Sequence, residues 1–151
     1  MKKIKILVLI LLIVLLSACS LTKEAIDEDD FNRIMISEGF KVTNVINEYV
    51  ESSYFEEAFI AEKDGYEIQF YELEDDSFAK KIYNANKQQM ESAKDGTYME
   101  SNVDLINNNK YSVDTQGTYT VVSRIDDTIV YLSVNSKFKE EVNSILKKLG
   151  Y

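Results

Sequence analysis

The chain has 151 residues and a formal net charge of -9, with no histidine, tryptophan or proline and a single cysteine. The lack of histidine excludes imidazole bases, Ser-His-Asp and Cys-His catalytic sites, and the usual histidine-containing metal sites, and a single cysteine excludes an internal disulfide. The excess of 26 acidic over 17 basic residues argues against nucleic-acid binding, which needs clustered cations.

Residues 1–19 have the pattern of an export signal. Lys2, Lys3 and Lys5 precede an unbroken apolar run from Ile6 to Leu16, which is followed by small residues and Cys19. As a helix, this run is about 16 Å long at roughly 1.5 Å per residue, well short of the ~30 Å hydrocarbon core of a bilayer. A membrane-spanning anchor is therefore not expected.

The tetrapeptide Leu16-Ser17-Ala18-Cys19 resembles the lipobox of bacterial lipoproteins. This resemblance implies that the signal peptidase recognises Leu16, Ser17 and Ala18 and cuts before Cys19. It also implies that Cys19 carries a thioether-linked diacylglyceryl group and that the protein is held at the extracytoplasmic face of the cell membrane. Two acyl chains give a stable anchor, whereas one is marginal. The alternatives are an ordinary secretory signal with an incidental cysteine, or a buried cysteine in a helix.

The expected organisation is a signal peptide over 1–18, a lipidated cysteine and short tether over 19–26, and a single domain over 27–151. Removing 1–18 removes three lysines and no acid, so the mature balance is 14 minus 26, or -12. An anionic leaflet repels such a domain, so the lipid must hold it. No named family is recognised for residues 20–151.

The first half of the domain predicts a helix, a short strand and a hairpin. An acidic cap at Asp29 or Asp30 and a stop at Gly39 predict a helix over about 30–38, followed by a strand over 41–46. Asp64-Gly65 fits a two-residue turn within a hairpin over 55–73. The register that this turn sets places one face of the hairpin in the core: Phe59, Ala61, Ile68 and Phe70.

The second half predicts a helix, a four-stranded meander and a last helix. Asp75 or Asp76 caps a helix that ends near Lys94, and strands follow at about 98–106, 110–114, 118–125 and 128–135. One face of the last hairpin is almost wholly apolar. The other is half polar and is expected to be solvated or partly covered. A final helix, capped by Ser136, has apolar residues at helical spacing: Phe138, Val142, Ile145, Leu146 and Leu149.

This order of elements predicts an α+β fold, in which about three helices pack on one face of an antiparallel sheet made of the hairpin and the meander. A helix followed by a four-stranded meander is similar to cystatin-like folds. That likeness concerns element order only and transfers no function.

Three residues are candidate ligand contacts. Arg124 stands mid-strand on the half-polar face near Tyr131, where a guanidinium can grip a carboxylate or phosphate, although such an arginine more often pairs with a neighbouring carboxylate. Ten tyrosines are the most unusual feature of the composition. Tyr71 is one of several near strand ends that could form an aromatic recognition patch, or equally pack as edge-strand residues.

Acidic residues offer weaker candidates. The runs 27–30 and 72–76 have oxygen ligands suited to calcium but lack the spacing of an EF-hand loop, and helix capping explains them better. Glu62 and Glu67 face each other across the hairpin, where an acid/base pair can be imagined, but an exposed hairpin end leaves both ionised. No metal site and no catalytic residue is therefore assigned.

These observations predict a lipid-anchored extracytoplasmic domain that binds a partner and is not an enzyme, with no cofactor apart from the diacylglycerol on Cys19. Its expected partners are the membrane, the lipoprotein-processing enzymes and a membrane-proximal protein. Two other classes stay open: a weak carboxylate- or tyrosine-based hydrolase of envelope polymers, and an inhibitor or immunity-type lipoprotein that occludes a surface partner.

Overall fold

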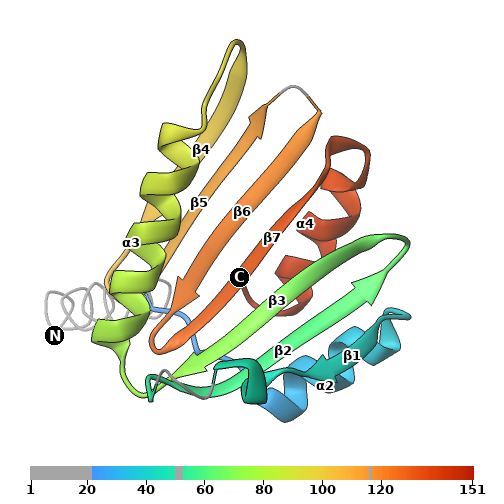
Figure 1. Cartoon of the computed structure of the whole chain (residues 1–151), viewed down its shortest axis with the longest axis vertical. Coiled ribbons are helices and arrows are strands. Elements are labelled where there is room, and N and C mark those ends of the chain that lie inside the picture. The colour runs from blue at the N-terminus through green and yellow to red at the C-terminus, as the bar shows by residue number, and fades with distance from the viewer. Residues whose placement is uncertain (1–21, 50–52, 116) are drawn as a thin grey trace, which may run out of the picture.

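The computed structural model describes residues 22–49, 53–115 and 117–151, which form a seven-stranded antiparallel sheet with helices on both faces (Figure 1). The strand order is β1-β2-β3-β7-β6-β5-β4. The strands are β1 (Lys41–Asn44), β2 (Phe55–Lys63), β3 (Tyr66–Leu73), β4 (Tyr98–Asp104), β5 (Asn108–Thr115), β6 (Thr118–Ile125) and β7 (Thr128–Asn135). The helices are α2 (Glu28–Ser37), α3 (Asp76–Ser92) and α4 (Lys139–Lys148), with short 3-10 turns η2 (Ile46–Tyr49) and η3 (Ser136–Phe138).

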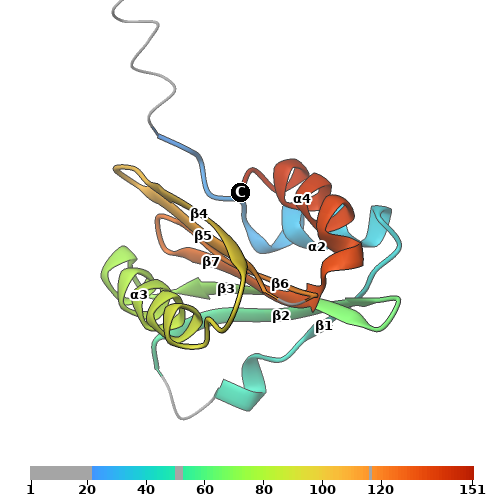
Figure 2. The same ribbon diagram turned by 90° about the horizontal axis from the view of Figure 1, so that it is seen from above.

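The α+β class, with an antiparallel sheet built from a hairpin and a four-stranded meander, is confirmed. The helices, however, are divided between the two faces, with α2 and α4 on one and α3 on the other (Figure 2). The physical reason is that the half-polar face of the meander still carries enough apolar side chains to pack against α3. Val122 and Ile129 are fully buried there, together with Tyr111 and Val113.

Both hairpins have the register that their turns predict. Lys63 pairs with Tyr66 across Asp64-Gly65, and Ile125 pairs with Thr128 across Asp126-Asp127. Asp64 and Asp126 adopt positive φ angles of 51° and 49°, a conformation that aspartate tolerates and that two-residue hairpin turns require. The predicted core face is buried, and Phe31 of α2 stacks on Phe70 with ring centroids 4.7 Å apart.

Helix starts differ by a few residues from the sequence prediction. Asp27, and neither Asp29 nor Asp30, caps α2 by accepting a hydrogen bond from the Asp30 backbone N–H at 2.8 Å. Asp75 caps α3. The last helix begins after a 3-10 turn that Asn135 caps in place of Ser136, because the Asn135 side chain accepts from the Lys137 N–H.

The strands of the meander also shift at one turn. β4 ends at Asp104 instead of residue 106, and β5 begins at Asn108 instead of Lys110. Asn108 and Asn109 are therefore buried strand residues. Of the three consecutive asparagines at 107–109, only Asn107 lies in the turn. This difference places Asn109 next to Arg124 of β6.

Candidate functional site

Arg124 of β6 is fully buried between the sheet and α3, with none of its surface exposed to water. Its Nε donates to Asn109 Oδ1 at 2.7 Å, and its Nη1 donates to the Asp126 carbonyl oxygen at 2.6 Å. Its Nη2 has no hydrogen-bond partner in the described part of the chain. One donor nitrogen of a buried, permanently charged group is thus unsatisfied.

The charge of Arg124 also lacks a direct counterion. Within the described ranges, none of the ion pairs includes Arg124. The nearest compensation passes through Asn109, whose side-chain amide donates to the Asp104 carboxylate while its oxygen accepts from Arg124. A buried charge without a close partner is costly, so a site with an uncompensated guanidinium favours an anion.

A hollow of about 250 Å³ lies against Arg124, between α3 and the turn from β4 to β5. We call it the Arg124 hollow; it is lined by Lys80, Tyr83, Asn84, Lys87, Asp104, Leu105, Ile106, Asn109 and Arg124. Three of these side chains are cationic and one is a carboxylate. The hollow is therefore locally positive in a chain whose formal net charge is -9.

Tyr83 adds a second unsatisfied group to this hollow. Its hydroxyl is buried and has no partner among the residues described. Burial, followed by the nearby Asp104 carboxylate, raises the pKa of Tyr83 to about 12, while Arg124 opposes the shift. The hydroxyl is therefore protonated at neutral pH and can donate a hydrogen bond.

The two lysines of the hollow are free to rearrange. Lys80 forms a surface ion pair with Asp76 at 2.9 Å, and Lys87 lies over the Tyr111 ring at 5.3 Å from its centroid. An exposed ion pair such as Lys80–Asp76 is worth no more than about 1 kcal/mol, and the contact of Lys87 with the buried Tyr111 ring is worth about 0.5–2 kcal/mol. An anion can therefore recruit both ammonium groups directly, while the buried Arg124 acts on it mainly through its electric field.

Tyr71 and Tyr131, the other two candidate contacts, lie together in a second hollow of about 250 Å³. Here the hydroxyl of Tyr71 already donates to Gln69 Oε1 at 2.8 Å and lies 3.1 Å from the Tyr49 hydroxyl. Burial is the main cause that raises the pKa of Tyr71 well above its ordinary value. Because Tyr71 is satisfied within the protein, this hollow lacks the unmet polar groups that mark the Arg124 hollow.

The structure thus separates the sequence-predicted contacts into two places. The expected pairing of Arg124 with a neighbouring carboxylate is not among the ion pairs of the described residues. Because Arg124 is fully buried, a two-nitrogen grip on a ligand would require the side chains around it to move. The sequence analysis missed Lys80, Lys87 and Asn109. The spacing of Lys80, Tyr83 and Lys87, which places them on one face of a helix, was the available signal.

The acidic runs meet in a third hollow, at the start of α2 and the ends of β2 and β3. Its lining is wholly acidic: Asp27, Glu28, Asp29, Glu56, Glu57 and Glu72. Over the described ranges, no group of three or more carboxylates has an arrangement that could hold a metal ion. The carboxylates of this hollow repel one another, and the charge of Glu57 is the main cause that raises the pKa of Glu28.

The lipobox residues Leu16, Ser17, Ala18 and Cys19 lie outside the described residues, so the lipid anchor stays a prediction. Across residues 22–49, 53–115 and 117–151, no helix has the length and apolar character needed to cross a membrane.

Comparisons with known proteins found no match: neither protein-family models, nor curated proteins, nor solved structures resemble the chain.

The acidic hollow makes a prediction about pH and stability. Burial, followed by Asp127 and Glu56, raises the pKa of Glu72, so the folded state binds more protons near that pKa than the unfolded state does. The ionised carboxylate therefore costs stability at neutral pH, and this cost disappears as pH falls through the folded pKa. Glu72→Gln should raise the melting temperature at pH 7 by about 1–4 °C and have little effect near pH 4.

Glu74→Gln is the matched control for this variant, because Glu74 is exposed and does not line the acidic hollow. Thermal unfolding followed by circular dichroism at both pH values measures the difference. Equal shifts in melting temperature for the two variants, or a gain for Glu72→Gln that persists at pH 4, would contradict the stability cost assigned to ionised Glu72.

Proposed function

We propose that the chain is a lipid-anchored binding domain at the extracytoplasmic face of a bacterial membrane, and that it binds a phosphate or carboxylate group at the Arg124 hollow. The observation that supports this most strongly is the buried guanidinium of Arg124, beneath a hollow with two lysines. Among the described residues, its Nη2 has no hydrogen-bond partner and no carboxylate is ion-paired to it. An anion in the hollow supplies the missing charge and accepts hydrogen bonds from the lysines.

The alternative of a hydrolase has less support from the geometry. Glu62 and Glu67 face each other across β2 and β3, but Glu62 is exposed and Gln69 already donates to Glu67 at 2.6 Å. The carboxylates whose pKa is raised, Glu28 and Glu72, line an open hollow that holds only acids. General acid catalysis needs a carboxyl held next to a substrate, and a wholly acidic hollow offers no second group to bind one.

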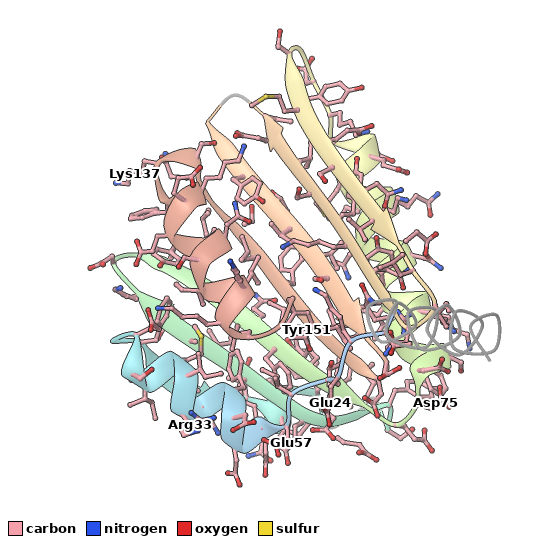
Figure 3. The ribbon with its side chains drawn as sticks, turned by 180° about the vertical axis from the view of Figure 1, so that it is seen from behind. Glu24, Arg33, Glu57, Asp75, Lys137 and Tyr151 are labelled. Atoms are coloured by element: carbon pink, nitrogen blue, oxygen red, sulfur yellow. The ribbon has the colours of Figure 1, made fainter. Side chains whose placement is uncertain are left out.

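If the hollow binds an anion, substituting Arg124 should weaken phosphate binding, whereas substituting Arg33 should not. In the membrane-extracted protein in neutral detergent, inorganic phosphate at about 100 times its dissociation constant should stabilise the fold by about 2.7 kcal/mol. Arg124→Met should weaken phosphate binding by about tenfold or more. Arg33→Gln should leave it unchanged, because Arg33 is exposed on α2 and pairs with Asp30 (Figure 3).

Because a buried substitution can disturb folding, two lysines that are not buried give a second test. Lys87→Gln should weaken binding by about threefold to tenfold, whereas Lys147→Gln on α4 should have no effect. Titration calorimetry of the folded variants measures these constants. Phosphate and acetate that both fail to bind the wild type, or that bind all variants equally, would contradict the proposal.

The lipid anchor makes a separate prediction about mass. Protein extracted from bacterial membranes should lack residues 1–18 and carry the added mass of a diacylglyceryl group on Cys19. Cys19→Ala should show neither change, because no other thiol is present to accept the lipid. Intact-mass spectrometry of both proteins measures this, and an unlipidated wild type would contradict the anchor while leaving the anion site untouched.

A further inference from the structure

Exposed apolar side chains gather on β4 and the turn that follows it. In the described part of the chain, seven large hydrophobic residues are exposed, and five of them lie in this segment: Tyr98, Met99, Val103, Leu105 and Ile106. Ile106 is the most exposed of all, at 74%. Leu105 and Ile106, which we call the apolar tip, also line the Arg124 hollow. The apolar tip and the cationic hollow are therefore parts of one surface.

The segment that leads back to Cys19 is fixed to this same turn. The Lys23 backbone N–H donates to Asn107 Oδ1 at 3.1 Å, and Asn107 Nδ2 donates to the Lys23 carbonyl oxygen at 2.6 Å. In Figure 3, the chain then passes through Glu24 towards α2. Cys19 lies four residues before Lys23 in the sequence, a reach of about 14 Å at most. A lipid on Cys19 therefore keeps the turn close to the bilayer.

Cations flank the tip on both faces of the sheet. Asn109 pairs with Asp104 and Arg124, and the next residue, Lys110, points to the opposite face because side chains alternate along a strand. Burial, followed by the charge of Lys23, lowers the pKa of Lys110. Lys23 and Lys110 thus lie near each other on one side, with Lys80 and Lys87 on the other. Asp104 and Asp126 are the acids next to the turn.

We propose that the turn Leu105–Asn107 inserts into the membrane interface and that the Arg124 hollow binds the phosphate of a lipid headgroup there. The inference rests on the lipid anchor and the anion site proposed above and names the source of the anion. Apolar side chains flanked by lysines fit an anionic bilayer, in which Ile106 enters the acyl boundary and the lysines contact the headgroups.

A label at residue 106 tests the insertion. The lipidated Ile106→Cys protein offers one free thiol, because the Cys19 sulfur carries the lipid, and this thiol takes an environment-sensitive fluorophore. The protein is reconstituted in vesicles of equal parts phosphatidylglycerol and phosphatidylcholine, or of phosphatidylcholine alone. Ile36→Cys on α2 and Met99→Cys at the opposite end of β4 are matched controls, since those side chains are 62% and 66% exposed.

The expected result is that the label at 106 is protected from aqueous iodide at least about threefold better than either control, and is quenched by spin-labelled lipid. Protection should be stronger with phosphatidylglycerol. Lys80→Gln with Lys87→Gln should reduce that preference, whereas Lys137→Gln with Lys147→Gln should not. These results together would support insertion and headgroup binding.

Three outcomes would overturn the inference in distinguishable ways. Phosphate that binds the hollow while the label at 106 stays fully accessible to iodide would leave the anion site intact and exclude the membrane as its source. Protection of both 106 and 99 in detergent, increasing with protein concentration, would assign the apolar edge to a second copy of the chain. If the label at 106 is protected equally in both vesicle types and phosphate does not bind, then neither headgroup binding nor the proposed anion site at the Arg124 hollow is supported.

Discussion

The pairing of β3 with β7 is the contact on which the rest of the structure depends. It joins the β1-β2-β3 half to the meander over five residue pairs, from Ile68 with Leu132 to Glu72 with Thr128. Because side chains alternate along both strands, the same pairing builds two cores. Phe70 and Val130 pack beneath α2 and α4, whereas Ile129 packs beneath α3. Losing this pairing would separate the two halves and open both faces.

The second core is where the fold makes a binding site possible. A sheet covered on one face would leave Arg124 in water, where its charge is cheaply solvated. Packing α3 over β6 removes Arg124 from water, and none of the carboxylates in the described ranges is ion-paired to it. The charge of Arg124 then lies under the hollow that Lys80 and Lys87 flank. The covered face thus places a strand arginine beneath the proposed anion site.

Local patterns in the sequence were enough to predict most of the fold. The turns at Asp64-Gly65 and Asp126-Asp127 set the register of both hairpins, and alternation placed Phe59 and Phe70 in the core. The division of the helices between faces was not predicted, because a half-polar strand face does not reveal whether a helix covers it. The site was predicted only in part, since Arg124 meets Lys80 and Lys87 through tertiary packing alone. Asn109 falls between the strands expected at about 98–106 and 110–114, because the run Asn107-Asn108-Asn109 contains no residue type that favours a strand.

The proposed site requires that an anion in the hollow change the environment of the buried Arg124 guanidinium. The chain contains only two arginines, so guanidinium nitrogen-15 NMR of arginine-labelled protein gives one set of signals for Arg124 and one for Arg33. Inorganic phosphate should shift the Arg124 signals and slow exchange of its Nη2 protons, while the Arg33 signals stay in place. Arg124 signals that do not move at saturating phosphate, or that move in parallel with those of Arg33, would contradict it.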